Sequence, residues 1–532
     1  MAVVPPSITP QSAQAQSVKV VPASSEPTVL RLTPRQALLR ETLLASTSVS
    51  DGMMAFYTAQ GFVPVWTGRR IDALNRALAT AASHGLPAGR YPKIAKPGFS
   101  ASDSARVSAE IAAAQVFLRF ARDLNSGVLE PKSVDAEIHV FPRRPDEEAL
   151  LNGVLSARNL TNFIAALAPS DPGYDALMEE RTRLARLARK GGWGPKVPAG
   201  KTLRPGQSGA RVEALRARLG RILGQSLPAG SSYDESLIAA VKTFQDLYGL
   251  NADGVAGPAT LQTVNATVGQ RLGQVYVNLE RHRWLNFNRG TRHIYVNQAD
   301  YTVQVVEKGR VIYTSRTVIG KTEHQTPEFS DQMTHLVVNP TWHVPRSIAT
   351  EKYLPELKRN PRALNKAGIQ VMTRSGKAIN AGLVDFRKFS KSNFPFIMKQ
   401  PPGPGNALGR VKFMFPNQFA IYLHDTPAKR LFNRDLRAYS HGCIRVQKPF
   451  ELAEVLLAPQ MANPKGTFQS LLNAGRERQV NLDAPVPVHL TYQTAWVTPD
   501  GTPQYRADIY GRDAKVLRAL ERAGVALSDQ SG

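Results

Sequence analysis

The chain has 532 residues, 42% of them hydrophobic, and a formal net charge of +25 at pH 7. This length exceeds what one hydrophobic core can organise, so two to four domains are expected, and no stretch approaches the roughly 18 apolar residues of a membrane span. A single cysteine excludes an intrachain disulfide framework and a cysteine-rich zinc site.

The positive charge predicts attraction to an anionic partner, such as nucleic acid, a membrane surface or an acidic cell-wall polymer. Lysine and arginine are spread along the whole chain, without a zinc finger, an RRM-like aromatic motif or a dense basic block. Nucleic acid is therefore not expected as a partner.

The first 32 residues are predicted to form a disordered leader, because Pro, Ser, Gln and Ala dominate MAVVPPSITPQSAQAQSVKVVPASSEPTV. They contain neither the charged start nor the apolar core of a signal peptide. The protein is thus expected either to be cytoplasmic or to lack its export signal in this chain.

Residues 33–195 are predicted to be helical. In ARVSAEIAAAQVFLRFARDL, apolar side chains recur at steps of three and four residues, at Val107, Ile111, Ala114, Leu118 and Ala121. Trp66 is expected to anchor this core, and the region contains no catalytic constellation.

A Gly- and Pro-rich boundary leads into residues 196–268, which are predicted to form three helices. The apolar stripes are Val212, Leu215, Leu219 and Ile222 on one helix, and Leu237, Val241, Phe244 and Tyr248 on the next. Gly249 is expected to end the second helix and Pro258 to begin the third. The stretch YDESLIAAVKTFQDLYGLNADGVAGPATLQTVN resembles the peptidoglycan-binding module of bacterial wall enzymes, with Asp253, Gly254 and Gly257 in its characteristic loop.

Residues 269–482 are predicted to form a β-rich domain, since HIYVNQADYTVQVVEKGRVIYTSRTVIG alternates β-branched and polar residues around a Lys308-Gly309 hairpin turn. Residues 345–410 interrupt the β pattern and are expected to form a capping insertion. A β-hairpin and a short helix are expected in residues 483–532. The fold class is therefore a multidomain α+β protein.

The lone cysteine lies in AYSHGCIRVQKPF, with His441 two places before it and Arg445 two places after it. A thiol becomes a useful nucleophile when an imidazole takes its proton, and Gly442 would let a substrate approach backbone N–H groups that hold an oxyanion. His424, at the end of the predicted strand in QFAIYLHDTP, competes with His441 for the role of base, and spacing alone does not choose between them. A lone cysteine can also be a small buried hydrophobe.

The arrangement H-x15-SHGC-x-R, with IYLHDTP and QPPGPGNALG, resembles the YkuD-type L,D-transpeptidase catalytic domain, most closely the large Gram-negative subgroup with a helical scaffold and a peptidoglycan-binding domain. The resemblance implies that Cys443 is the nucleophile, that His424 transfers protons and that the backbone carbonyl of Asp425 orients the imidazole. His441 and Gly442 would shape the oxyanion region. The residues expected at the substrate are Tyr422, Ser440, Arg445 and Trp342. Many family members carry asparagine at the position of Arg445.

The resemblance implies cross-linking of peptidoglycan stem peptides between third-position diaminopimelate residues through a cysteine thioester, inhibition by carbapenem-type β-lactams, and a periplasmic location. The alternatives are an L,D-carboxypeptidase or cross-link hydrolase that uses the same thioester, and a non-catalytic wall-binding scaffold. No cofactor or metal is expected, because no HExxH or other ligand-spaced cluster occurs in the sequence. His324 is expected to be merely exposed, and His343 either lines the cleft or packs in a core.

Overall fold

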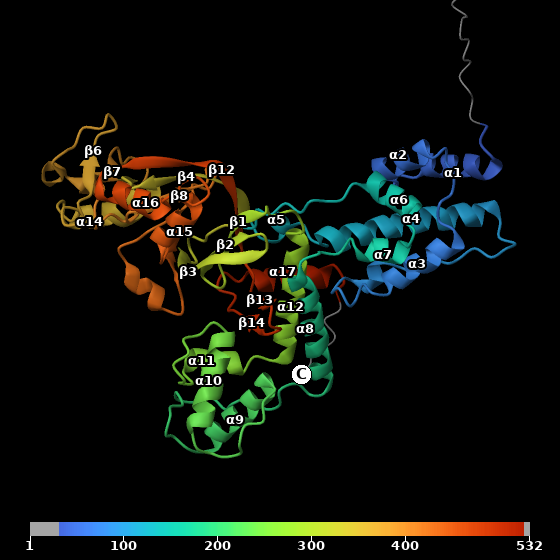
Figure 1. Cartoon of the computed structure of the whole chain (residues 1–532), viewed down its shortest axis with the longest axis horizontal. Helices are drawn as coiled ribbons and strands as arrows, with labels where there is room; N and C mark the ends of the chain where they lie inside the picture. Colours follow the sequence, from blue (N-terminus) through green and yellow to red (C-terminus); the bar gives the residue numbers. More distant parts are fainter. Residues whose placement is uncertain (1–30, 526–532) are drawn as a thin grey trace, which may run out of the picture.

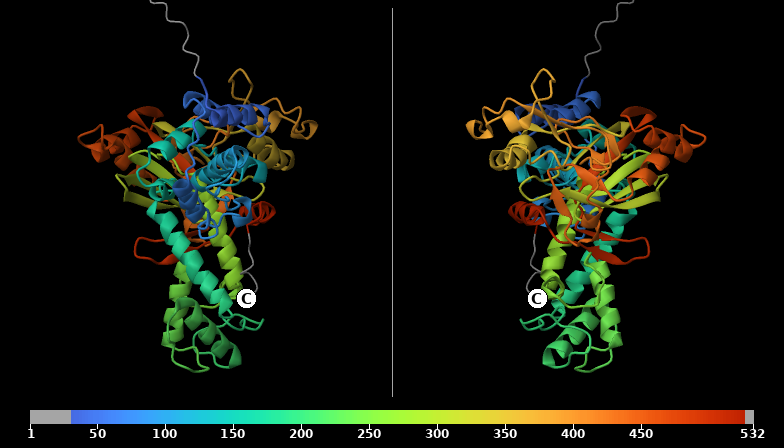
Figure 2. Two further views of the ribbon diagram at one scale, coloured as in Figure 1. Left: turned by 90° about the vertical axis from the view of Figure 1, so that its right-hand side faces the viewer. Right: turned by 90° about the vertical axis from the view of Figure 1, so that its left-hand side faces the viewer.

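The computed structural model describes residues 31–525, so nearly all of the expected leader lies outside the described residues. Figure 1 shows three lobes: a helical lobe from the first third of the chain, a small three-helix lobe, and a β-rich lobe. Two long helices, α8 (Pro172–Arg189) and α12 (Val268–Trp284), run side by side between them (Figures 1 and 2). No helix in residues 31–525 is long and apolar enough to cross a membrane.

The helical lobe is built around α4 (Asp103–Ser126), which begins at the N-cap Ser102 and buries apolar side chains on most of its length. Trp66 is 6% exposed, as expected for a core residue. The buried carboxylate of Glu110 accepts hydrogen bonds from the Tyr57 hydroxyl and from the backbone N–H groups of Val65 and Trp66. The other helices of the lobe are α1 (Pro34–Ala45), α2 (Asp51–Ala59), α3 (Gly68–Leu78), η1 (Ala88–Arg90), α5 (Pro131–Val134), α6 (Glu147–Ser156) and α7 (Leu160–Ala165).

The small lobe contains α9 (Ala210–Leu223), α10 (Glu235–Leu247) and α11 (Pro258–Val264). Gly249 adopts φ 66° after α10, and the N–H of Leu250 donates to the carbonyl of Gln245, which is the Schellman pattern that ends a helix. Pro258 occupies the first turn of α11. The predictions for both residues are confirmed.

The β-rich lobe is a sheet that closes on itself. Eight strands pair in the order β3-β11-β9-β8-β4-β12-β1-β2, β2 also pairs with β3, and β10 adds to the edge of β3. Lys308 and Gly309 both have positive φ, as the predicted two-residue hairpin turn requires. The strands are β1 (Arg292–Asn297), β2 (Thr302–Glu307), β3 (Arg310–Gly320), β4 (Phe329–Val338), β8 (Val411–Met414), β9 (Leu423–His424), β10 (Ala438–Ser440), β11 (Ile444–Val446) and β12 (Arg478–Thr491).

Helices α15 (Pro449–Leu457) and α16 (Pro464–Asn473) pack apolar side chains into the core of this barrel-like sheet. The insertion has a core of its own and a three-stranded sheet in the order β5-β7-β6. Its elements, with the strand that precedes it, are β5 (Trp342–His343), α13 (Arg346–Ile348), the π-helix η2 (Ala349–Tyr353), α14 (Leu354–Arg359), β6 (Gln370–Met372), η3 (Ala381–Leu383), η4 (Phe386–Lys388) and β7 (Ile397–Gln400).

The expected boundary between residues 482 and 483 is wrong, because β12 crosses it and pairs with β4 and β1 up to residue 491. Residues 483–491 therefore belong to the main sheet. The hairpin lies further on, at β13 (Ala495–Val497) and β14 (Pro503–Tyr505), and is followed by α17 (Arg512–Arg522).

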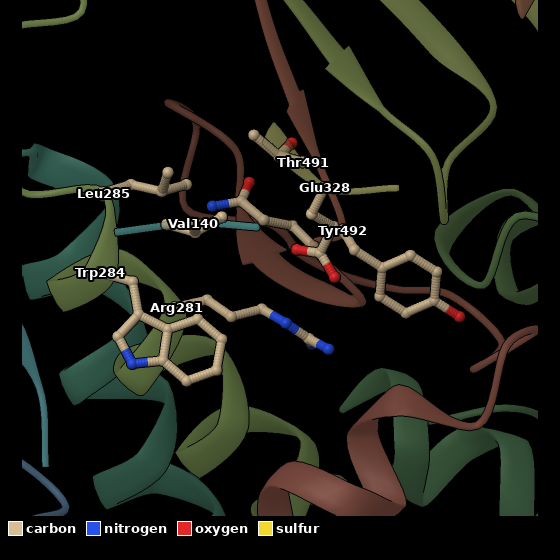
Figure 3. A pocket seen from close by; sticks show the side chains of 8 residues that line it. Val140, Arg281, Trp284, Leu285, Glu328, Thr491 and Tyr492 are labelled. Atoms are coloured by element: carbon tan, nitrogen blue, oxygen red, sulfur yellow. The ribbon is translucent and has the colours of Figure 1, made fainter. Parts of the chain in front are cut away.

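Buried ion pairs connect α12 and α17 to the sheet. Arg281 of α12 lies 2.6 Å from Asp513, and Arg512 lies 2.9 Å from Glu328 at the start of β4. A cavity of about 10 Å³ lies beside Arg281, Trp284 and Glu328 (Figure 3), and the Arg281 Nε and Nη2 atoms have no hydrogen-bond partner among the described residues. The space suits one water molecule, which would satisfy these donors. These buried ion pairs hold α12 and α17 against the β-rich sheet.

Candidate active site

Strand pairing places Cys443 and His424 on the same face of the sheet. In the parallel pair of β9 and β11, Ile444 faces Leu423 and Arg445 faces His424. Cys443 therefore lies opposite Tyr422 and diagonal to His424, because side chains two residues apart point to the same side of a strand. The rings of Tyr422 and His424 are 5.7 Å apart. Leu423 points the other way and is fully buried, as the alternation predicted.

His424 is 5% exposed, and its Nδ1 lies 2.5 Å from the backbone carbonyl of Asp425. A carbonyl oxygen can only accept, so Nδ1 carries the proton and the neutral ring has its lone pair on Nε2; the backbone of Leu408 also lies close to the ring. Burial, followed by the charge of Arg445, lowers the pKa of His424 to about 3. The imidazole is therefore neutral and held in the tautomer that a general base requires.

The carboxylate of Asp425 is fixed on two sides. One oxygen accepts from Lys429 Nζ at 2.6 Å, and the other accepts from the backbone N–H of Arg410 at 2.9 Å. Gly409 has φ 63°, and a Cβ atom there would lie 2.3 Å from the Asp425 carboxylate. Only glycine fits this close approach, so the segment before β8 sets the position of the carbonyl that orients His424.

The thiol of Cys443 is half-buried, and its sulfur donates to the carbonyl of Ala420 at 3.6 Å. Burial raises the pKa of Cys443 to about 11, although the backbone N–H and hydroxyl of Tyr422 and the charge of Arg445 act in the opposite direction. The resting pair is therefore a thiol and a neutral imidazole rather than a thiolate and an imidazolium.

The loop 440–443 is held by its own hydrogen bonds. The buried hydroxyl of Ser440 donates to the Cys443 carbonyl at 2.5 Å and accepts the Gly442 N–H at 3.1 Å. This hydroxyl makes its hydrogen bonds inside the loop, and the expected contact of Ser440 with substrate stays a prediction. Thr326 donates to the Gly442 carbonyl at 2.6 Å. The backbone N–H of Cys443 has no acceptor within residues 31–525, so it is available to a ligand, whereas that of Gly442 is occupied by Ser440.

Arg445 presents a cation beside Cys443. Its guanidinium forms no hydrogen bond or ion pair with any described residue, and its Nε atom is buried without a partner. Burial lowers the pKa of this guanidinium from its usual range. A half-buried guanidinium without a partner suits a substrate carboxylate.

His441 and Trp342 lie in other surroundings. The His441 ring stacks on His324, with ring centroids 4.4 Å apart. Trp342 is 7% exposed and packs edge-on against Tyr353 in the core of the insertion. Trp342 thus packs in the core of the insertion, and its expected contact with substrate stays a prediction. His343 is exposed.

Sequence reasoning missed several residues that shape the site. Thr326 contacts Gly442, 116 residues away, whereas Gly409 and Lys429 contact Asp425, which lies 16 and 4 residues from them. The motifs QTPEFSDQM and QPPGPGNALG contain Thr326 and Gly409, and their link to the site follows only from the tertiary contacts. The helical lobe also reaches the site, since the ring of His139 lies 4.4 Å from that of Phe419 in the turn before β9.

The chain joins a helical lobe and a three-helix module to a β-rich domain whose sheet carries a thiol and an imidazole on one face. Family models match residues 291–488 as "L,D-transpeptidase catalytic domain", residues 51–180 as "Scaffold domain" and residues 208–264 as "Putative peptidoglycan binding domain". The chain therefore contains an L,D-transpeptidase catalytic domain that is preceded by a scaffold domain and a peptidoglycan-binding domain.

A curated "Putative L,D-transpeptidase" from Haemophilus influenzae is 33% identical over 245 residues, which cover 45% of this chain and 48% of that protein. The chain thus spans about half the length of this relative. Two solved L,D-transpeptidases, from Xylanimonas cellulosilytica and Stackebrandtia nassauensis, are 16% and 14% identical. The matches cover 56% of this chain in both cases, and 100% and 97% of the solved chains, with TM-scores of 0.18 and 0.20. No conclusion about the fold or the function of this chain is drawn from similarity at these TM-scores.

Proposed function

We propose that the protein is a cysteine L,D-transpeptidase that links third-position diaminopimelate residues of two peptidoglycan stem peptides. The observation that carries the proposal is the common face of Cys443 and His424, together with the bond from the His424 Nδ1 to the Asp425 carbonyl, which puts the lone pair of the neutral ring on Nε2. Because the thiol is neutral at rest, its proton is transferred during the attack rather than before it.

In the first step, the sulfur of Cys443 attacks the carbonyl between the L-centre of diaminopimelate and the terminal D-alanine of a tetrapeptide stem. His424 takes the thiol proton at Nε2, and the free N–H of Cys443 donates to the oxyanion. The intermediate collapses, the C–N bond breaks, and His424 returns the proton to the amine of the departing D-alanine. A thioester remains on Cys443.

In the second step, a side-chain amine of diaminopimelate on another stem attacks the thioester. His424 accepts a proton from this amine and returns it to the departing sulfur, which restores the thiol. The thioester conserves the energy of the broken peptide bond, so the reaction as written uses no cofactor and no metal. Asp425 keeps the imidazole in one orientation through both steps.

Charge supports a carboxylate-bearing substrate. Arg445 lies beside the thiol without a partner among the described residues. The net charge of +25 acts in the same direction and would raise the local concentration of anionic stem peptides near the protein.

The insertion 345–410 is proposed to cap the donor site and exclude water, which competes with the acceptor amine. Water attack on the same thioester would instead make the protein an L,D-carboxypeptidase or a cross-link hydrolase. A non-catalytic scaffold needs neither the thiol nor the oriented imidazole.

The proposed substrate lies in the periplasm, so the periplasm is the proposed location of the protein. Nucleic acid is not a proposed partner.

Purified tetrapeptide muropeptides and mass analysis of the products test the proposal. Cross-linked dimers with release of D-alanine support transfer, whereas tripeptides alone identify the hydrolase. Intact mass after exposure to a carbapenem then tests the nucleophile: a covalent adduct on the parent but not on Cys443→Ala is expected. If neither dimers nor tripeptides form and no adduct appears, the catalytic proposal is wrong and the scaffold reading takes its place.

A further inference from the structure

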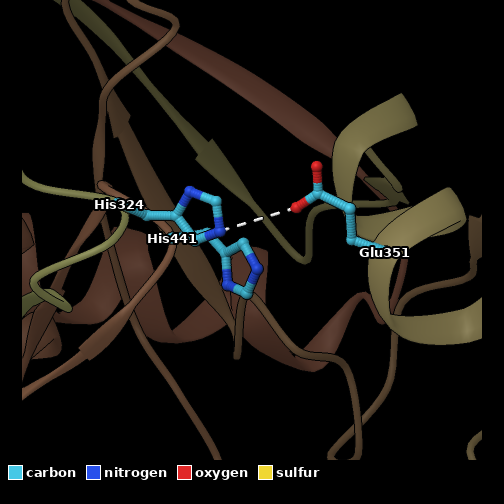
Figure 4. A group of neighbouring side chains, drawn as sticks. All are labelled: His324, Glu351 and His441. Carbon is cyan, nitrogen blue, oxygen red and sulfur yellow. Dashed lines mark ion pairs between the residues drawn. The ribbon is translucent and has the colours of Figure 1, made fainter.

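His324, Glu351 and His441 form a cluster (Figure 4). None of these side chains transfers a proton in the two proposed steps. Each offers one ligand atom, and these atoms all lie within 4.8 Å of one another. No ligand-spaced motif in the sequence indicates this cluster, because its three residues come from segments that are distant in the chain and meet only in the fold. His324, expected to be exposed, has 32% of its side-chain surface exposed and also contacts the other two residues.

We propose that these three residues bind a zinc ion that ties the insertion to the catalytic loop 440–443. His324 comes from the loop between β3 and β4, Glu351 from the π-helix η2 of the insertion, and His441 from loop 440–443. Two imidazoles and one carboxylate are a ligand set that zinc accepts, with a fourth position left for water or a substrate carboxylate.

The spacing is near that of a bound ion. The His324 Nε2 and Glu351 Oε2 atoms are 3.5 Å apart, and two ligands about 2.0–2.1 Å from a tetrahedral zinc lie about 3.3 Å apart. The rings of His324 and His441 are stacked at 21° with their centroids 4.4 Å apart, so one ring has to turn before both nitrogen lone pairs can meet on one ion. His324 and Glu351 each have 32% of their side-chain surface exposed, so an ion reaches them from solvent.

The place of Glu351 in the fold supports a functional role. It lies in η2, a five-residue π-helix between two short α-helices. Single π-helical turns are rare and are frequent at functional sites. This turn brings the carboxylate to the two imidazoles. A bound ion would therefore connect the insertion directly to the loop that carries the thiol.

Nearby lysines oppose the ion and limit its affinity. Lys391 Nζ lies 2.6 Å from Glu351 Oε1, which leaves Oε2 facing His324. Lys321 and Lys352 also act on His441 through their charge. Removal of Lys391 should therefore tighten metal binding, which is a result that an accidental surface contact would not produce.

The test uses the full chain with Cys443→Ala, so that the thiol does not bind the metal and the result does not depend on the proposed reaction. Titration with Zn²⁺ against a zinc-chelating dye should give one ion per chain. His324→Ala and Glu351→Gln should each weaken binding at least about tenfold, since even residues that only support a ligand change metal affinity 10- to 100-fold. Lys391→Ala should strengthen it about threefold, the size of one exposed ion pair.

His343→Ala is the matched control, because His343 is an exposed histidine close to the insertion in sequence. It should leave zinc affinity unchanged, and thermal melting should show that each variant is folded. Hydrogen exchange of residues 349–353 should slow when Zn²⁺ is added. Absence of one-to-one binding, or binding that survives both His324→Ala and Glu351→Gln, would overturn the proposal.

Discussion

His441 lies two residues before Cys443 in the chain, and His424 lies near it on the neighbouring strand. The two histidines have different surroundings in the fold. His424 is 5% exposed, and its tautomer is set by the Asp425 carbonyl. His441 is half-buried and stacks on His324 beside a carboxylate of the insertion. A base needs one fixed tautomer and a lone pair aimed at its proton, whereas a ligand needs access to solvent. The comparison supports the proposal that His424, rather than His441, transfers protons.

Replacement of His424 by alanine should have the largest effect. The rate of cross-linked dimer formation should fall about a thousandfold, within the usual contribution of a general acid and base. His441→Ala should cost about tenfold or less, because its ring does not accept the thiol proton in this mechanism. Initial rates with tetrapeptide muropeptides measure both. Equal losses, or a larger loss for His441→Ala, would reverse the assignment.

Alkylation of the resting protein checks the neutral pair. The pKa of Cys443 is raised to about 11 and that of His424 is lowered to about 3, so only about one thiol in ten thousand is ionised at pH 7. The rate of modification by iodoacetamide should therefore rise about tenfold per pH unit from pH 7 to pH 10. Cys443 is the only cysteine, so intact mass reports this site alone. A plateau that begins below pH 8 would mean a preformed thiolate and imidazolium pair.

Substitution of Gly409 tests whether the Asp425 carbonyl sets the orientation of His424. Gly409→Ala places a Cβ atom 2.3 Å from the Asp425 carboxylate, at φ 63°, and should reduce dimer formation about a hundredfold or less, the range seen when a supporting contact of a catalytic group is lost. It should also lower the free energy of unfolding by about 1–3 kcal/mol.

Gly405→Ala is the control for that change, since nothing lies within 4 Å of its added Cβ and its φ is not left-handed. Rates and denaturant unfolding of the two variants give the comparison. If Gly409→Ala and Gly405→Ala retain the same activity, the position of Asp425 does not govern His424.

Removal of the unpartnered cation should have the smallest effect. Arg445→Gln should raise KM for the donor stem about tenfold, the loss of one charge-assisted contact, and should change kcat less. The exposed Arg430 offers a matched control, and Arg430→Gln should leave KM near the parent value. A fall in kcat without a rise in KM would place Arg445 in the reaction rather than in substrate binding.

Local patterns predicted much of the fold correctly. The stripes of α9 and α10, the helix end at Gly249 and the turn at Lys308-Gly309 depend on contacts between residues near in sequence. The boundary at residue 482 was wrong because β12 is continuous across it and gains its hydrogen bonds from β4 and β1, which are far away in the chain. Strand alternation also placed Tyr422 and His424 on one face, opposite Leu423.

The sequence by itself determined the residues of the motif, namely the thiol, the two candidate imidazoles and the cation at Arg445. Their order and spacing can be recognised because they lie in one short segment and the strand before it. Only the tertiary structure decided how they differ. The pairing of β9 with β11 placed His424 diagonal to Cys443, and the insertion brought Glu351 to His324 and His441. Protonation, tautomer and ligand geometry depend on neighbours that the chain supplies from a distance, and burial and hydrogen bonding act only after those neighbours have met.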